Sequence, residues 1–211
     1  MIAIFVSVFV AVFSMLNPLG AVPVFLAMTP NDTSAKRSKI ALHTSFYVVA
    51  LLLVFFWAGQ YILEFFGITI DAMRIAGGVM ILSSGYGLLS GKFAESRTVS
   101  NEVQQEALQK ADISFSPMAM PLLAGPGSIS MLIAKHDEYQ EWEDRLVIAG
   151  VIVSLGFVCF LILRAAPLLA KLFGVAGLNA VSRIMGFLSM SIGVQTIIVG
   201  VYSLIRWARA H

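Results

Sequence analysis

Two clusters of helix-breaking residues, each in the middle of an apolar segment, are the places where this sequence is able to do chemistry. Their members are Asn17, Pro18, Leu19 and Gly20 in the first cluster, and Gly125, Pro126, Gly127 and Ser128 in the second. A proline inside a helix removes a backbone hydrogen bond at a cost of about 3 kcal/mol or more. The half-helix after such a break points unpaired N–H groups at the gap, and the half-helix before it ends in carbonyl oxygens. These two kinds of group suit the carboxylate and the amine of a small zwitterion.

The elements that carry these clusters must lie in a membrane, because the composition excludes an ordinary soluble domain. Of the 211 residues, 58% are hydrophobic and 12% are charged, against about 25% charged in soluble domains. Six apolar segments are candidates to cross a bilayer core of about 30 Å as helices. They cover about 2–28, 40–66, 75–89, 113–134, 146–172 and 181–205. We therefore predict one all-α integral membrane domain, residues 1–211, with six spans of which the first and fourth are discontinuous.

An internal repeat relates the two clusters. The matched features are Pro18 and Pro126 at an offset of 108 residues, Phe66-Gly67 and Phe173-Gly174 at 107, and 74–77 and 183–186 at 109. A common offset in a common order indicates a duplication. The units are about 1–90 and 113–211, joined by a polar connector, 91–112, in which 101–111 is predicted to form an amphipathic helix. Each unit holds three spans, an odd number, so the two units are predicted to be inverted repeats.

The net charge and the types of reactive residue exclude several classes of function. The net charge of +2 is small and scattered, so no nucleic-acid partner is predicted. The single cysteine, Cys159, excludes a cysteine metal cluster within one chain. No acidic residue lies clearly within a span, since Glu64 and Asp71 flank a short link. Without a nucleophile–base pair or a set of metal ligands, we predict no enzyme, no metal and no cofactor, and recognition mainly by backbone ends.

The break clusters also have a purely structural interpretation, because proline and glycine are common in membrane helices and favour close packing. One cluster alone favours packing, whereas two in corresponding positions favour a binding site. The other polar candidates are weaker. We expect an interfacial position for His43, a pathway or interhelical role for Gln60 and Gln195, and helix anchoring for Arg74 and Arg183. The pairs Ser83/Gly87 and Ser189/Gly193 are predicted to serve helix packing.

Basic residues indicate the orientation. Nine of the 14 lysines and arginines fall on the side of the membrane that carries the connector. By the positive-inside rule this side is cytoplasmic, and both termini are predicted to lie outside.

At these residues the chain resembles the MarC family, which belongs with the lysine-exporter-like transporters. The resemblance covers nearly the whole chain and rests on 17–20 with Pro23, 66–68, 74–78, 121–127 and 183–186. It implies a six-span protein of the prokaryotic plasma (inner) membrane, some relatives of which transport small neutral amino acids such as glycine and alanine. It also implies a substrate site at the two discontinuous helices, that is, at 17–20 and 125–128. Gly125 stands where the first motif has Asn17, so Asn17 is the only side-chain amide of that site.

The leading hypothesis is a secondary transporter of small neutral amino acids that works by alternating access, one inverted unit moving against the other. The coupling ion, H⁺ or Na⁺, and the oligomeric state are left open. Two alternatives remain: a non-transporting membrane scaffold or regulator that recruits a partner through residues 91–112, and an exporter of another small metabolite or drug. Drug export favours a wider, more aromatic cavity than glycine-lined breaks suggest.

Overall fold

The computed structural model describes residues 1–90 and 112–210, and within them all regular secondary structure is helical. The elements are α1 (Ile2–Leu16), α2 (Pro18–Met28), α3 (Ser34–Phe65), α4 (Ile70–Leu89), η1 (Ser114–Leu123), α7 (Pro126–Glu138), α8 (Trp142–Arg164) and α9 (Ala166–Ala210). Five helical segments are long and apolar enough to cross a membrane, and six if η1 and α7 form one bent span. This confirms the predicted all-helical membrane protein. The amphipathic helix predicted at 101–111 lies outside the described residues.

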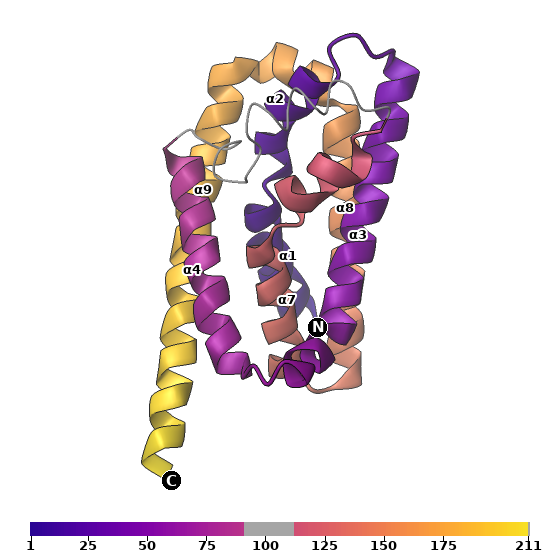
Figure 1. The fold of residues 1–211 in the computed structure, drawn as a ribbon. Helices are drawn as coiled ribbons and strands as arrows, with labels where there is room; N and C mark the ends of the chain where they lie inside the picture. The colour runs from indigo at the N-terminus through magenta and orange to yellow at the C-terminus, as the bar shows by residue number, and fades with distance from the viewer. Residues whose placement is uncertain (91–111, 211) are drawn as a thin grey trace.

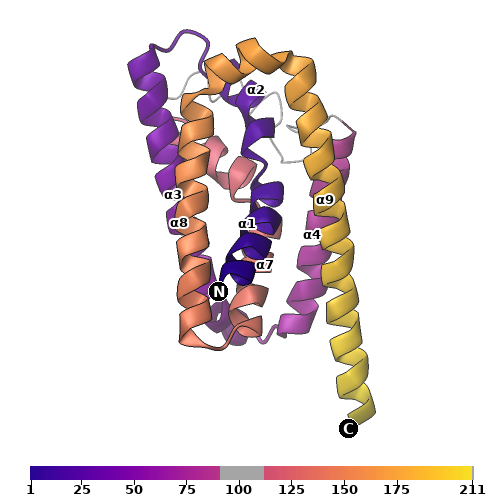
Figure 2. The same ribbon diagram turned by 180° about the vertical axis from the view of Figure 1, so that it is seen from behind.

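The helices form a bundle with two outer pairs and a central layer (Figures 1 and 2). Helices α3 and α8 lie together on one side, and α4 and α9 lie together on the other. Between them run α1 and α2 in one direction and η1 and α7 in the opposite direction. Both chain ends lie toward the same end of the bundle, which we call the terminal end. The opposite end, where α4 ends and η1 begins, is the connector end.

The first break is a single residue. Asn17 has φ 43° and ψ 59°, in the left-handed region, and separates α1 from α2. Asparagine is among the few residues other than glycine that visit this conformation routinely. Its side-chain oxygen also accepts a hydrogen bond from the N–H of Gly20 at 3.2 Å, which caps α2. Pro18 follows at the first helical position, where its missing N–H costs nothing within α2.

The second break is wider, and the segment before it is irregular. Ser116 and Met120 each precede a proline and have extended backbone, as expected when the proline ring crowds the preceding residue. The segment also makes hydrogen bonds between residues five apart, such as the one from the Ala124 N–H to the Ala119 carbonyl oxygen at 2.8 Å. Helix α7 then restarts with Pro126 at its first position, and η1 and α7 are bent by 67°.

Helices α4 and α9 touch through their backbones. A Cβ built on Gly85 would stand 2.7 Å from the carbonyl oxygen of Gly186, and one built on Gly78 would stand 2.8 Å from the carbonyl oxygen of Gly193. Cβ atoms do not come this close to backbone atoms, so glycine is required on both helices. The close approach predicted for this helix is therefore present, but Ser83, expected to mediate it, is exposed.

Several of the predicted first and last residues of the spans were wrong, because the apolar runs do not coincide with the residues at which the helices begin and end. Thr33 accepts a hydrogen bond from the Lys36 N–H and starts α3 about six residues before the apolar run. Thr69 likewise starts α4 at Ile70 rather than 75. The fifth predicted span, 146–172, in fact ends at Arg164. The remainder belongs to α9, which is interrupted at Gly174 (φ 63°).

Candidate functional site

The two predicted clusters lie at the centre of the bundle, but they do not form one cavity. Asn17, Gly20, Gly127 and Ser128 are buried, as are Pro18 and Gly125. Leu19 is half-buried and Pro126 is exposed. The predicted residues therefore belong to two separate features. One is the buried amide group of Asn17 at the first break, and the other is a small pocket beside the second break.

The Asn17 amide group is the polar centre of the first break. Its nitrogen is fully buried and has no hydrogen-bond partner in the described part of the chain. A Cβ on Gly20 would overlap this nitrogen and stand 2.6 Å from the hydroxyl oxygen of Ser182 on α9. Gly20 therefore leaves room for both polar groups. A buried donor without an acceptor costs about 1–3 kcal/mol, so this nitrogen is suited to an acceptor such as a carboxylate.

A small pocket lies beside the second break, and we call it the hydroxyl pocket. It has a volume of about 10 Å³, enough for about one water molecule. Three serines from three helices line it: Ser84 of α4, Ser128 of α7 and Ser189 of α9. Its other lining residues are Met15, Ile81 and Gly127. Because Met15 belongs to the last turn of α1, the pocket touches both broken spans.

One of these serines repairs the backbone of the first break. In an uninterrupted helix the N–H of residue 18 would bond to the carbonyl of Ser14, but Pro18 has no N–H. The hydroxyl of Ser189 donates to that carbonyl oxygen at 3.1 Å across 175 positions of sequence. Such repair by a neighbouring helix is what makes a proline tolerable inside a membrane span. The lining of the hydroxyl pocket is therefore tied to the conformation of the broken helix.

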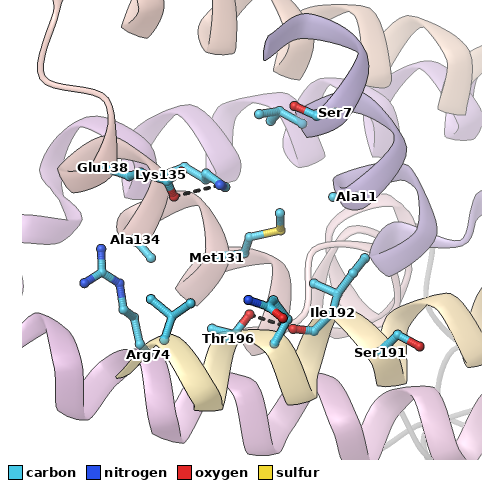
Figure 3. A pocket seen from close by; sticks show the side chains of 13 residues that line it. Ser7, Ala11, Arg74, Met131, Ala134, Lys135, Glu138, Ser191, Ile192 and Thr196 are labelled. Atoms are coloured by element: carbon cyan, nitrogen blue, oxygen red, sulfur yellow. Dashed lines mark hydrogen bonds and ion pairs between the residues drawn. The ribbon is translucent and has the colours of Figure 1, made fainter. Parts of the chain in front are cut away.

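A larger cavity of about 380 Å³ lies on the terminal side of the breaks, and we call it the vestibule. Figure 3 shows its lining from α1, α4, α7 and α9. Met131 lies one turn beyond Ser128 on α7, and Ile192 lies about one turn beyond Ser189 on α9. The vestibule thus lies about one helical turn from the hydroxyl pocket, and its lining includes Gln195, one of the predicted pathway residues.

Charged side chains frame the terminal end of the vestibule. Arg74 on α4 pairs with Asp137 on α7 at 3.1 Å and with Asp71 at 3.2 Å. Asp71 also accepts a hydrogen bond from Ser203 of α9 at 2.9 Å. Lys135 bonds to its neighbour on the next turn of α7, Glu138, at 2.7 Å (Figure 3). Arg74 therefore ties two helices together, which is more than the helix anchoring predicted for it.

Apolar side chains fill the connector side of the breaks. Side chains with no exposed surface there include Ala21, Val22 and Phe25 after the first break, and Met118, Ala119, Leu122 and Leu123 before the second. A separate hollow of about 330 Å³ at the connector end is lined by residues that include His43, Asp112 and Ser114. There a hydrogen bond from Ser114 is the main cause that lowers the pKa of Asp112. Among the described residues, the large cavity near the breaks therefore lies on their terminal side.

Sequence reasoning missed most of the polar partners at the site. Ser14, Ser84 and Ser182 carry no motif, and Ser189 was assigned to packing alone. One signal was available: Pro18 implies that the carbonyl of residue 14 needs a donor. Which helix supplies the donor depends on the packing of α9 against α1, which no short spacing reveals.

Interrupted helices, a polar centre and a cavity near the breaks define a polytopic α-helical membrane protein with a candidate small-molecule site at mid-span. Comparison with known sequences places it more narrowly: residues 2–205 match the profile described as "MarC family integral membrane protein". The chain belongs to the MarC family.

Relatives with known names cover nearly the whole chain. A UPF0056 membrane protein of Buchnera aphidicola (subsp. Schizaphis graminum) is 39% identical over 96% of this chain and 93% of its own length. The UPF0056 membrane protein YhcE of Escherichia coli K12 is 33% identical over 94% and 92%. The UPF0056 inner membrane protein MarC of Salmonella paratyphi A is 35% identical over 90% of each chain. No solved structure matches the chain significantly.

Proposed function

We propose that this protein is a secondary transporter of small neutral amino acids that works by alternating access. The observation that carries the proposal is the vestibule, which lies on the terminal side of the two helix breaks about one helical turn from the hydroxyl pocket, with buried apolar side chains packed on the connector side of the breaks. A transporter caught open to one side has this form, because its substrate site at mid-membrane is reached from one face at a time. The proposal involves no catalytic step and no cofactor.

The chemistry at the breaks favours a small zwitterion. The amide nitrogen of Asn17 offers a buried donor for a carboxylate. The hydroxyl pocket offers oxygen acceptors for an amine, and its volume of about 10 Å³ leaves little room for a side chain. A large apolar drug has no matching space between the breaks, so export of drugs is the less favoured alternative.

We infer that the moving bodies are the two outer helix pairs rather than the two sequence repeats. Helix α4 of the first unit packs backbone to backbone against α9 of the second, so neither unit is free to move alone. The repeat itself gains support from the Phe-Gly dipeptides: Gly67 and Gly174 have positive φ angles of 64° and 63°. In the proposed cycle, the α4–α9 pair moves against the α3–α8 pair, with the broken spans between them (Figure 1).

We further propose the plasma (inner) membrane as the location, following the name of the Salmonella relative. With the connector end in the cytoplasm, as the basic residues predict, the vestibule faces outward. The structure would then represent an outward-open form.

Counterflow in proteoliposomes tests the transport proposal. Vesicles containing the purified protein and loaded with unlabelled glycine, alanine or serine are expected to accumulate labelled substrate transiently. Absence of counterflow with all three amino acids would refute the proposal.

A pair of tryptophan variants separates a transporter from a membrane scaffold. Ser191→Trp adds a large ring to an exposed position of the vestibule lining, and it is expected to abolish counterflow. Ser154→Trp on α8 is the matched control, since Ser154 likewise bonds only to its own helix and lies outside the vestibule. Both variants should insert and fold. If S191W transports like wild type, the vestibule is not the substrate pathway.

A further inference from the structure

We propose that the hollow at the connector end binds the headgroup of a zwitterionic phospholipid, with the phosphate on one wall and the ammonium of an ethanolamine group on the other. We call it the connector hollow, and its volume is about 330 Å³. Its lining consists of Lys36, Lys39, Ile40 and His43 of α3, and of Asp112 and Ser114 at the beginning of the fourth span. The proposal is independent of transport, because it concerns a lipid of the surrounding bilayer.

The connector hollow carries charges of both signs that do not pair with each other. Hydrogen bonding by Ser114 is the main cause that lowers the pKa of Asp112, and the nearby charges of His43 and Lys39 lower it further. Among the described residues, however, no ion pair within 4.0 Å joins Asp112 to either of these two side chains. A ligand with an anionic and a cationic group a few bonds apart is able to contact both walls at once.

The carboxylate of Asp112 is held in place from the protein side. It accepts a hydrogen bond from the backbone N–H of Ser114 at 2.8 Å, and the buried hydroxyl of Ser114 donates to the Ile40 carbonyl oxygen at 3.4 Å. The carboxylate is therefore tied to the helix that carries the lysines. Its remaining lone pairs suit the N–H donors of a primary ammonium. The quaternary ammonium of a choline group has no N–H to donate.

The opposite wall is basic. Lys36, Lys39 and His43 are spaced three and four residues apart, so they share one face of α3. The charge of Lys36 is balanced by Asp32, with which it pairs at 2.6 Å. Lys39 is exposed and makes no ion pair with a described residue, so it is the lysine that we assign to the phosphate. Lys39 and Asp112 together have no net charge, which matches a zwitterionic headgroup better than an anionic one.

The position of the hollow along α3 places it in the headgroup layer. With 32 residues, α3 is about 48 Å long, whereas the hydrocarbon core of a bilayer is about 30 Å thick. The excess falls at its first turns, because 34–39 are polar and charged and the apolar run begins at Ile40. Figure 1 shows these turns at the connector end of the bundle. The lysines and Asp112 therefore lie at the depth of lipid phosphates.

Exposed aromatic side chains border the hollow and favour a lipid over a soluble ligand. Phe46 lies one turn after His43 on α3 and is 66% exposed, and Phe115 follows Ser114 and is 48% exposed. The ring of Tyr47 contacts both, at centroid distances of 6.0 and 5.4 Å. A polar hollow followed by an exposed apolar surface fits a headgroup with its acyl chains. Free phosphoethanolamine has no group that contacts these rings.

Two charge variants test the two walls separately. Lys39→Gln removes the exposed cation, and Lys171→Gln, an exposed lysine at the same end of the bundle but outside the hollow, is its control. Asp112→Asn removes the negative charge but keeps an oxygen that accepts from the Ser114 N–H. Its control is Glu143→Gln, an exposed carboxylate in the first turn of α8.

The measurement is thermal unfolding of the purified, full-length protein in detergent while one lipid is titrated. The lipids have identical acyl chains and an ethanolamine, choline or glycerol headgroup, and free phosphoethanolamine is tested at the same concentrations. Binding to the folded protein raises the unfolding temperature. We expect wild type, K171Q and E143Q to be half-saturated by the ethanolamine lipid at a lower mole fraction than by the other two lipids.

The variants should change this preference in different ways. K39Q should raise the half-saturating mole fraction about three- to tenfold for all three lipids, because each has the phosphate. D112N should raise it by a similar factor for the ethanolamine lipid alone, and so remove the preference for ethanolamine over choline. Phe46→Ala is an independent variant that should weaken binding of all three lipids, with the similarly exposed Phe157→Ala on α8 as its control.

Four results would overturn the proposal. One is half-saturation of wild type by the glycerol lipid at the same or a lower mole fraction than by the ethanolamine lipid. Another is a preference for ethanolamine that D112N leaves unchanged, or lipid binding that K39Q leaves unchanged. Equal weakening by F46A and F157A would show that the acyl chains do not lie on Phe46. An equal shift with free phosphoethanolamine would show that the ligand is soluble.

Discussion

Replacing Asn17 with glycine should separate its role in the fold from its role in binding. Asn17 does three things: it holds a left-handed backbone (φ 43°), it caps α2 through the Gly20 N–H at 3.2 Å, and it buries an amide nitrogen without a partner. Glycine adopts the left-handed conformation without steric cost. As a cap it is weaker than asparagine by only a few tenths of a kcal/mol. Removing the unpartnered nitrogen also relieves a desolvation cost of about 1–3 kcal/mol.

Because the relieved desolvation cost exceeds the loss from the weaker cap, these terms predict that Asn17→Gly is at least as stable as wild type. Asn17→Ala should fare worse, because alanine loses the cap at about 1 kcal/mol and pays about 1–2 kcal/mol for the left-handed backbone. Both variants lose the unpartnered nitrogen, so for a chain of this size N17A should unfold roughly 5–10 °C below N17G. Thermal unfolding in detergent measures both variants.

The apparent affinity for glycine in transport should depend on the presence of the Asn17 amide group and not on the stability of the variant. If the Asn17 nitrogen donates to the substrate carboxylate, N17G loses a charge-assisted hydrogen bond. Its half-saturating glycine concentration in counterflow should then rise about tenfold or more. A stable N17G protein with wild-type counterflow would refute the role in binding. A drop in stability as large as that of N17A would refute the account of the break.

Three further predictions concern the bundle. Gly85→Ala should destabilise the protein by about 1–3 kcal/mol, because its Cβ would stand 2.7 Å from an α9 carbonyl oxygen. The control is Gly150→Ala, whose Cβ meets nothing within 4 Å and which should be neutral or stabilising in thermal unfolding. Equal effects of the two substitutions would contradict the close α4–α9 contact. Arg74→Gln should lower the unfolding temperature more than Asp137→Asn, because it leaves the carboxylates of both Asp71 and Asp137 without their cation. The reverse order would show that the Arg74 ion pairs are not the main polar contact between α4 and α7. Cys159 is fully buried, so a water-soluble maleimide should label it only after unfolding, as followed by mass; rapid labelling of the native protein would place it elsewhere.

The break points were predictable because proline and asparagine act locally. Pro18 and Pro126 each sit at the first position of a helix, and Asn17 takes the left-handed conformation that few residues other than glycine adopt. Such preferences depend on the residue and its immediate neighbours, so they are visible in the sequence. The helix starts were not predicted, because Thr33 and Thr69 cap helices in polar segments that hydropathy treats as loops.

The partners at the site were not predictable by the same means. Ser189 reaches Ser14 across 175 positions, and Arg74 reaches Asp137 across 63. Both contacts exist because α9 and α7 pack against particular faces of α1 and α4. Packing in a membrane is decided by small side chains and shape, since lipid is as apolar as the helix surfaces and hydropathy does not distinguish one face from another.

The α4–α9 contact also limits how alternating access can work in this chain. Gly186, Gly193 and Gly200 recur every seven residues and bring the backbones of the two helices together over most of α4, so a shift between α4 and α9 would lose many close contacts at once. The contacts between this pair and α7 are fewer, and they include the Arg74–Asp137 ion pair and the packing of Ile81 against Gly127. Motion should therefore occur between α7 and the α4–α9 pair. Since Gly127 and Ile81 line the hydroxyl pocket, any such motion must change the pocket, and this would couple occupancy of the site to the position of the helices.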